Sequence, residues 1–229
     1  MMKTGIKVHG YDLALTHSAV VELTDGELTG YWYITPNKTS YKKGLDGDHS
    51  TLLNVKKMED KQQMHMERLS IFRSWLNDLI AWHPADFIGI EDYAIKSTSY
   101  AHLVGEIGGA ARLLCSDSKT LFRLHDPLSI KLFTTGKGNS KKPAMEAAVL
   151  EEYGVDFTRY NKSEKDHTTS EDLCDSYAVA KMVWLEYQLR HGLIELKDLG
   201  EEKIRVLNRV TKSYPINILG RSWIGQEEG

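Results

Sequence analysis

The 229-residue sequence predicts an α/β fold built on one mixed β-sheet. Three observations support this prediction. Short apolar stretches typical of strands open the chain around a hairpin turn. Two further strands each follow a segment whose apolar residues recur three and four positions apart, as on one face of a helix. More helical segments close the pattern, which reads β-β-β-α-β-α-β followed by helices.

The first 35 residues predict three consecutive antiparallel strands, at 5–15, 18–24 and 28–35. Asp25-Gly26 separates the second from the third, and glycine accepts the positive φ that a tight hairpin turn requires. Asp12 lies near the exit of the first strand. Residues 36–54 are rich in Lys, Gly, Ser and Asp and are expected to form a long loop, functional or mobile.

Two helix–strand pairs then follow, namely helix 58–82 with strand 86–93, and helix 101–115 with strand 120–125. They complete a predicted five-stranded mixed sheet, three antiparallel strands and then two parallel ones, flanked by helices. Helix 101–115 contains Gly105, Gly108 and Gly109, each about 1 kcal/mol less favourable than alanine. Such glycines indicate close approach of a partner subunit or a nucleic acid, or else tight packing of the helix on the sheet.

The remaining helices are predicted at 129–133, 145–153 and 172–190. Beyond them the periodicity weakens, and 203–210 and 214–219 are each expected to be a short strand. We therefore expect one domain over 1–190 and an appendage over 191–229.

Composition bounds the class of protein. No apolar stretch approaches the ~20 residues that cross a bilayer, and residues 1–7 lack a secretory signal pattern, so a cytoplasmic protein without membrane contact is expected. Cys115 and Cys174 show no metal-binding spacing and are expected to be reduced, buried thiols. The net charge is −3, but 119–142 carries six basic residues against a single acid; taken alone, this segment is more often an ordinary solvated surface than a nucleic-acid surface.

Four acids stand out by position. Asp12 and Glu91 each end an apolar strand, where a carboxylate is costly unless it is solvated, paired or bound to a cation. Asp172 and Asp175 are three residues apart at the predicted start of the last helix, so they share a face. Helix capping is an alternative explanation for that pair, because acids complement the dipole of a first turn. We expect the four acids to meet in one site.

Grouped carboxylates suit metal-assisted phosphodiester hydrolysis. Two Mg²⁺ ions about 3.5–4 Å apart can hold the attacking and leaving oxygens of an in-line displacement. Mg²⁺ prefers oxygen ligands and keeps several waters, so few carboxylates suffice. Asp12, on the central strand, is the expected bridging acid, and nearby lysines would stabilise charge on the phosphate.

Four motifs occur in order over residues 5–185. They are Gly10-Tyr-Asp, the run Phe87-Ile-Gly-Ile-Glu-Asp-Tyr with the glycine-rich helix after it, Pro127-Leu-Ser-Ile-Lys with its glycine–lysine turn, and Asp172-Leu-Cys-Asp-Ser-Tyr-Ala-Val-Ala. In sequence and in order, these motifs resemble those of RuvC-type Holliday junction resolvases. Leu13-Ala14 replaces the family's Pro-Gly. The aromatic residue that opens bases at the crossover is displaced, which leaves Tyr93 as the candidate for contacting an unstacked base.

The resemblance implies an RNase H-like fold, a homodimer, and symmetric nicking of four-way DNA junctions with two Mg²⁺ per site, replaceable by Mn²⁺. Asp12, Glu91, Asp172 and Asp175 would be the metal ligands. Lys131 and Lys142 would contact the phosphate backbone near the scissile bond. Arg123, Lys137 and Lys141, in the same basic segment, are also expected to bind the nucleic acid. Loop 36–54 and the tail exceed the compact bacterial form, which suits a phage-encoded or otherwise divergent member located in the host cytoplasm.

Three alternatives stay open on the sequence. The first is another RNase H-fold nuclease that cuts flaps, forks or RNA–DNA hybrids, because the fold alone does not select the substrate. The second is a non-catalytic junction-binding protein, which the presence of all four acids disfavours. The third, an actin-like phosphotransferase, lacks the glycine-rich phosphate loops that such enzymes use.

Overall fold

A computed structural model describes residues 4–14, 16–35, 50–52, 60–92, 101–161, 168–208 and 218–226. Its strands are β1 Lys7–Leu13, β2 Ser18–Thr24, β3 Glu27–Thr35, β4 Ser50–Leu52, β5 Phe87–Glu91 and β6 Leu121–His125. Its α-helices are α1 Lys61–Trp82, α2 Ala101–Asp117, α3 Pro127–Thr135, α4 Lys142–Tyr153, α5 Thr168–Arg190 and α6 Glu201–Leu207. Short 3-10 turns lie at Thr158–Tyr160, Leu196–Asp198 and Ile218–Gly220.

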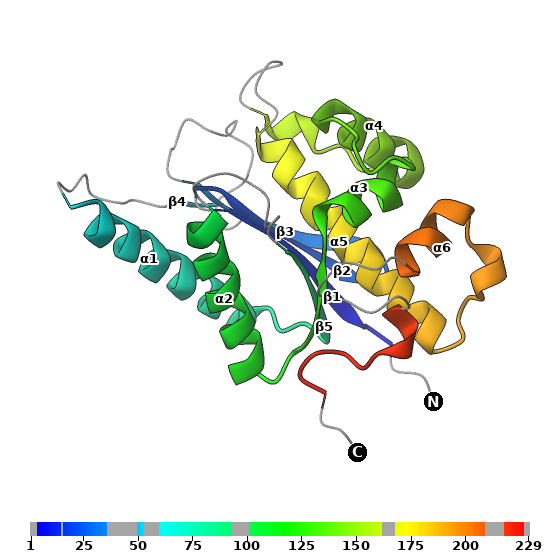
Figure 1. The fold of residues 1–229 in the computed structure, drawn as a ribbon, viewed down its shortest axis with the longest axis horizontal. Coiled ribbons are helices and arrows are strands. Elements are labelled where there is room, and N and C mark those ends of the chain that lie inside the picture. The colour runs from blue at the N-terminus through cyan, green and yellow to red at the C-terminus, as the bar shows by residue number, and fades with distance from the viewer. Residues whose placement is uncertain are drawn as a thin grey trace.

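The sheet has the order β4-β3-β2-β1-β5-β6 (Figure 1). β1 pairs antiparallel with β2 and parallel with β5, which in turn pairs parallel with β6. The five predicted strands and their directions are confirmed. The short strand β4, parallel to β3, was not predicted and lies within the expected loop 36–54; residues 36–49 and 53–59 lie outside the described part of the chain.

The β2–β3 hairpin closes as its sequence predicts. Asp25 and Gly26 have φ values of 50° and 89°, the two positive values of the turn type that matches the twist of paired strands. The carboxylate of Asp25 also accepts hydrogen bonds from the backbone N–H groups of Gly5 and Ile6, each at 2.9 Å. This ties the turn to the entrance of β1.

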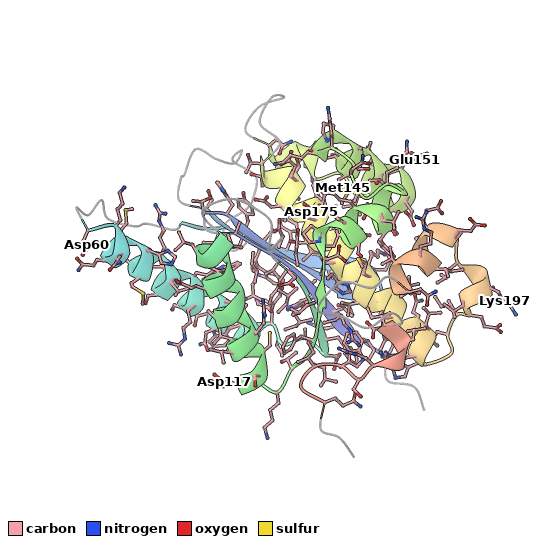
Figure 2. The ribbon with its side chains drawn as sticks, viewed as in Figure 1. Asp60, Asp117, Met145, Glu151, Asp175 and Lys197 are labelled. Carbon is pink, nitrogen blue, oxygen red and sulfur yellow. The ribbon has the colours of Figure 1, made fainter. Side chains whose placement is uncertain are left out.

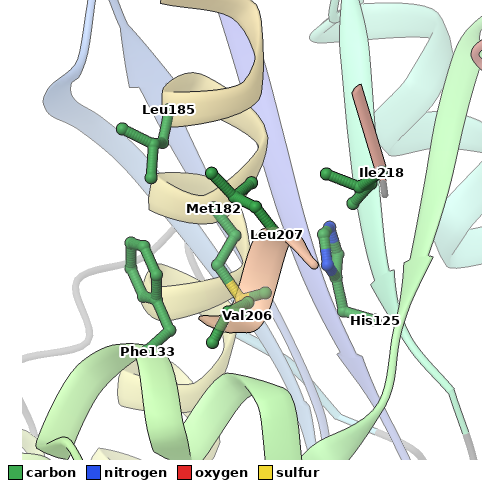
Figure 3. A pocket seen from close by; sticks show the side chains of 7 residues that line it. All are labelled: His125, Phe133, Met182, Leu185, Val206, Leu207 and Ile218. Atoms are coloured by element: carbon green, nitrogen blue, oxygen red, sulfur yellow. The ribbon is translucent and has the colours of Figure 1, made fainter. Parts of the chain in front are cut away.

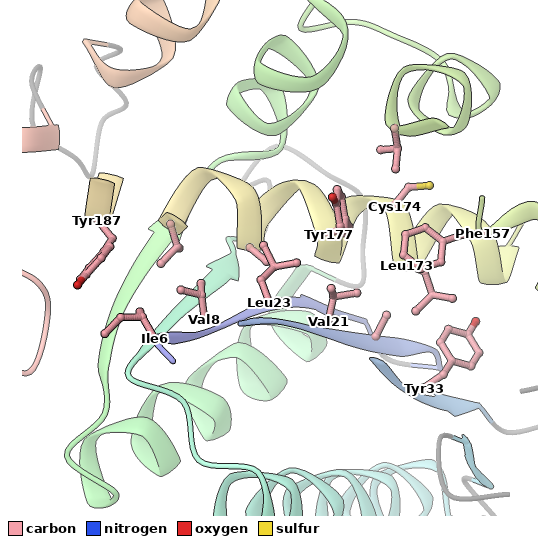
Figure 4. Packing of buried hydrophobic residues seen from close by; sticks show 14 of the residues in the cluster. Ile6, Val8, Val21, Leu23, Tyr33, Phe157, Leu173, Cys174, Tyr177 and Tyr187 are labelled. Atoms are coloured by element: carbon pink, nitrogen blue, oxygen red, sulfur yellow. The ribbon is translucent and has the colours of Figure 1, made fainter. Parts of the chain in front are cut away.

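Helices cover both faces of the sheet (Figure 1). α1 and α2 pack on one face over a buried cluster that includes Tyr11, Leu76 and Ile90. α5 lies across the other face, where Val8, Val21 and Leu173 share a second cluster (Figure 4). α3, α4 and α6 pack on the outer side of α5. A strand period of two therefore sends Val8, Gly10 and Asp12 towards α5.

Helix boundaries follow from local signals. Asp60 caps α1 by accepting hydrogen bonds from Gln62 and Gln63, and α1 ends before His83-Pro84, as expected. Asp126 caps α3. α5 begins four residues before the predicted Asp172, so Asp172 and Asp175 lie beyond its first turn. The capping explanation for these two acids is therefore wrong.

The tail beyond residue 190 packs on the rest of the chain where it is described. Phe122 of β6 and Ile224 exchange backbone hydrogen bonds of 3.1 and 3.0 Å, and Trp223 is buried in the α5-side core. The strand expected at 203–210 is wrong within the described residues, because α6 is a helix there. The strand expected at 214–219 lies mostly outside them. The domain boundary at residue 190 stays a prediction.

Two further expectations concern the cysteines and membrane-spanning segments. Cys115 and Cys174 are free and buried, as predicted. Among the described residues, no helix is long and apolar enough to span a bilayer.

Candidate active site

Asp12 and Glu91 meet because their strands are parallel neighbours. Tyr11 of β1 is in register with Ile90 of β5, so Asp12 and Glu91 occupy the next position on each strand at the same edge of the sheet. Both side chains point to the face that α5 covers. The expectation that a strand-end Asp and a strand-end Glu converge is confirmed.

α5 brings Asp175 to this edge through a close backbone approach. A Cβ placed on Gly10 would lie 1.9 Å from the Ser176 carbonyl oxygen and 2.5 Å from the Ala180 nitrogen. Only glycine permits this contact. The Ser176 hydroxyl accepts a hydrogen bond from the Asp12 N–H at 3.2 Å and donates one to the Ala19 carbonyl at 3.0 Å. One turn of α5 is thus fixed against β1 and β2 beside the acids.

Three of the four predicted acids form a compact group. Asp12, Glu91 and Asp175 each offer a carboxylate oxygen within 4.8 Å of the others, and all three are half-buried. Figure 2 labels Asp175 on α5. Asp172 is a neighbour and not a member of this group. Its Oδ2 accepts a hydrogen bond from the hydroxyl of Tyr33 on β3, at 2.9 Å.

The electrostatics of the group favour an added positive charge. Burial, reinforced by repulsion from Glu91, Asp172 and Asp175, raises the pKa of Asp12 well above its ordinary value. Burial and the charge of Asp175 do the same to the pKa of Glu91. Burial is also the main cause that raises the pKa of Asp172 to about 7 and that of Asp175 to about 6. Acids packed this way are stabilised by a cation.

A divalent metal ion fits the residues present. The donor set is all carboxylate oxygen, which Mg²⁺ and Mn²⁺ prefer. In addition, Asp175 Oδ1 is buried without a hydrogen-bond partner among the described residues. An unpaired buried carboxylate oxygen is costly, and a bound cation would remove that cost.

Two predicted lysines lie beside the acids. The positive charge of Lys131 on α3 lowers the pKa values of Glu91 and Asp175 against the effect of burial, and that of Lys142 acts likewise on Asp12 and Asp172. Lys142 also forms an ion pair with Glu171, whose side chain is 7% exposed. Glu171 was not predicted as a site residue.

Lys137 and Lys141 are exposed on the turn between α3 and α4. Hydrogen bonds from two hydroxyl groups stabilise this turn. The Thr135 hydroxyl lies within donating distance of the Lys131 and Lys137 carbonyls, at 2.7 and 3.0 Å. The Ser140 hydroxyl donates to the Lys137 carbonyl at 2.8 Å. The turn therefore presents both lysines from an ordered backbone.

Arg123 does not belong to this surface, which corrects the sequence prediction. Its side chain is 5% exposed and bonds to the Glu186 carboxylate at 2.7 and 3.2 Å. It also donates to the carbonyls of Ser222 and Arg221 and lies over the Trp223 ring. A guanidinium buried and paired in this way cannot contact a phosphate. Tyr93, the predicted base contact, lies outside the described residues.

A separate apolar pocket lies between α5, α6 and β6 (Figure 3). It is lined by His125, Phe133, Met182, Leu185, Val206, Leu207 and Ile218. Burial lowers the pKa of His125 to about 3, so this imidazole is neutral at physiological pH. None of the four acids lines the pocket.

Three residues that shape the site were not predicted from the sequence: Tyr33, Glu171 and Ser176. Glu171 and Ser176 flank the two acids of α5 in the sequence, but nothing in their pattern marks them. Tyr33 occurs in an apolar strand, Tyr31-Trp-Tyr-Ile, where a tyrosine is indistinguishable from an ordinary core residue.

Comparison with known proteins identifies the fold. No protein-family model matches the chain, and neither does any curated protein. A solved structure of Thermus thermophilus RuvC is 16% identical, with a TM-score of 0.52, over 82% of this chain and 97% of that chain. A second, of T. thermophilus RuvC in complex with Holliday junction substrate, is 13% identical, with a TM-score of 0.53, over 79% and 94%.

These two likenesses show an RNase H-like α/β fold, and in this chain the carboxylate cluster lies at the end of the central strands. Within that fold class, the chain has the RuvC-type fold, as the sequence resemblance implied.

Proposed function

We propose that the protein is a divalent-metal-dependent endonuclease that resolves four-way DNA junctions. The observation that carries the proposal is the group Asp12, Glu91 and Asp175 on a RuvC-type fold. The same fold binds a Holliday junction substrate in T. thermophilus RuvC. That protein is 13% identical to this chain, so the four-way junction as the substrate of this chain is part of the proposal.

The proposed chemistry assigns a task to each residue. Asp12, Glu91 and Asp175, with Asp172 at their side, would hold Mg²⁺ or Mn²⁺, two ions per site in the proposal. The metal would supply Lewis-acid stabilisation of the phosphate and a nucleophilic water. Lys131 and Lys142 would bind the scissile phosphate. Lys142 reaches the phosphate once it leaves Glu171, and that carboxylate holds it near the site until then.

The exposed lysines of the α3–α4 turn would bind the flanking backbone. Phosphate contacts release counterions, so junction binding should weaken steeply with salt. Replacement of Lys137 or Lys141 by glutamine should lower the slope of log K against log salt by about 1 each. Replacement of the buried Arg123 is not expected to change that slope through a direct contact.

A homodimer would place two such sites on one junction. On α2, Leu113 is 67% exposed, and a Cβ on Gly109 would meet nothing within 4 Å. These two residues are four apart, so they lie on one face of the helix. Tight packing within the described chain therefore does not account for Gly109. We propose that this face contacts a second copy, which light scattering after size-exclusion chromatography would detect.

Cleavage of defined substrates tests the function. The protein would be incubated with a mobile four-way junction, a flap and an RNA–DNA hybrid, each with Mg²⁺, Mn²⁺ or EDTA. Paired nicks at symmetric positions on the junction are expected. They should disappear in Asp12→Asn and persist in Asp117→Asn, a matched change at an exposed site (Figure 2). Cleavage of the flap or hybrid alone would favour another RNase H-fold nuclease, and binding without cleavage would favour a junction-binding protein.

A further inference from the structure

Tyr33 connects the far side of the sheet to the acidic site. It lies on β3, separated from β1 by β2, and its side chain is completely buried on the face that α5 covers. Figure 4 shows it at the end of the core cluster, near Leu173 of α5. Its hydroxyl donates to Asp172 Oδ2 at 2.9 Å. The side chain of Thr169, also on α5, hydrogen-bonds to the same hydroxyl.

The surroundings of Tyr33 leave its hydroxyl little freedom. The ring packs within the apolar cluster that includes Ala19, Val21 and Leu173, and it stacks on His17 with the ring centroids 6.3 Å apart. A tyrosine hydroxyl ordinarily loses its proton only at about pH 10, so it is a hydrogen-bond donor at neutral pH. The group is therefore a rigid hydrogen-bond donor fixed by the sheet.

This contact distinguishes Asp172 from the other three acids. Asp12, Glu91 and Asp175 converge on one another, whereas Asp172 has one carboxylate oxygen engaged by a phenol. Each carboxylate oxygen has two lone pairs, and this bond uses one of those on Oδ2, which leaves Oδ1 the less encumbered oxygen for a further ligand. The bond also restricts rotation of the carboxylate about the Cβ–Cγ bond. Partners behind a metal-binding group set its orientation in this manner, and their loss typically weakens metal binding about 10–100-fold.

We infer that Tyr33 is a positioning residue that makes Asp172 a one-oxygen ligand and so favours Mg²⁺ over larger cations. The inference rests on the proposed function only in assuming that the acids bind a metal ion. Mg²⁺ requires a near-octahedral arrangement at about 2.0–2.1 Å, while Ca²⁺ accepts six to eight oxygens, mono- or bidentate, at about 2.3–2.6 Å. Fixing Asp172 in a one-oxygen geometry serves the smaller ion. Releasing it permits the two-oxygen geometry that Ca²⁺ accepts.

The test uses metal binding to the full chain without nucleic acid. Mg²⁺ and Ca²⁺ would be titrated calorimetrically into the wild type, Tyr33→Phe, Asp172→Asn and the double variant. Tyr33→Phe should weaken Mg²⁺ binding about tenfold or more and Ca²⁺ binding much less. In the Asp172→Asn background, Tyr33→Phe should have no further effect, because the hydroxyl acts through that carboxylate.

Tyr31→Phe is the matched control. Tyr31 lies on the same strand and face, and its hydroxyl shares a 2.6 Å hydrogen bond with that of Tyr160, away from the acids. This variant should leave the ratio of Mg²⁺ to Ca²⁺ affinity unchanged, whatever it does to the melting temperature. A wild-type ratio in Tyr33→Phe, an equal change in Tyr31→Phe, or additivity with Asp172→Asn would overturn the inference, as would a wild type that does not bind Mg²⁺.

The outcomes separate this inference from the proposed function. If Tyr33→Phe alters metal preference and no junction is cut, the positioning role stands and the resolvase proposal fails. If the wild type cuts junctions and Tyr33→Phe binds metals as the wild type does, the resolvase proposal stands and the positioning role of Tyr33 fails.

Discussion

Gly10→Ala tests how the active site is assembled, because the added methyl group would be placed between α5 and β1. The new Cβ would lie 1.9 Å from the Ser176 carbonyl oxygen, whereas ordinary contact begins at 3.4 Å. The two nearest obstructing atoms, the Ser176 carbonyl oxygen and the Ala180 nitrogen, belong to the α5 backbone. Side-chain rotation therefore cannot relieve the clash. The helix must therefore move away from the strand by about 1.5 Å.

Two losses follow from that displacement. Inserting atoms into a packed core typically costs about 1–3 kcal/mol, and a backbone obstruction places this variant at or above the upper end of that range. Displacement also carries Asp175 away from Asp12, and misplacement of a reacting group by about 1 Å can lower activity about 100-fold. Urea unfolding followed by tryptophan fluorescence would measure the first loss. Junction cleavage at saturating Mg²⁺ would measure the second.

Gly89→Ala is the comparison variant. Gly89 is in register with Gly10 on the adjacent strand, but its two nearest obstructions are side-chain methyl groups of Val179 and Val183, at 2.5 and 2.7 Å, and not backbone atoms. Its destabilisation should be smaller, and most of the activity should remain. A Gly10→Ala protein with wild-type stability and cleavage would refute the claim that backbone contact between β1 and α5 sets the spacing of the acids.

Three other predictions concern the titration of two buried acids, a buried ion pair and an open position on α2. Burial raises the pKa values of Asp172 and Asp175 from 3.8 to about 7 and about 6, so the folded protein retains protons that the unfolded chain releases. The melting temperature in EDTA should therefore fall as pH rises from about 4 to 7, and added Mg²⁺ should restore it at pH 8. A melting temperature that climbs with pH would contradict the raised pKa values of these two acids. Glu186→Gln removes the charge between Arg123 and Arg190 and should cost about 3–5 kcal/mol in urea unfolding, while Lys197→Gln in an exposed pair should cost less than about 0.5. Gly109→Ala should raise the free energy of unfolding by up to about 1 kcal/mol yet weaken any dimer formed through α2, and unchanged association would argue against that interface.

Strands and long helices were predictable because their periodicity is local. The alternation in β1 and the helical spacing in α1 and α5 survive in the structure with shifts of a few residues. β4 was missed because three residues, Ser50–Leu52, carry no period of their own and depend on β3 for their partner. α6 was mistaken for a strand because seven residues of mixed polarity fit either pattern.

The site was predictable in composition but not in its internal arrangement. That Asp12 and Glu91 meet follows from parallel strands, whose carboxyl ends share one edge of the sheet. The distinction between Asp175, inside the group, and Asp172, bonded to Tyr33, depends on the rotation of α5 over three strands. Arg123 was misassigned because a basic residue in a basic segment resembles a surface residue until its partner, Glu186, is known.

The hydrogen bond from Asp12 to Ser176 joins residues 164 positions apart. During synthesis on the ribosome, β1 and β5 emerge long before α5, so Asp12 and Glu91 are present without Asp172 and Asp175. The complete set of four acids is present only once the chain has been made through Asp175. For a protein proposed to cut DNA, this order of emergence means that a nascent chain, or one terminated before Asp172, lacks part of the proposed metal-binding set and is expected to be inactive as a nuclease.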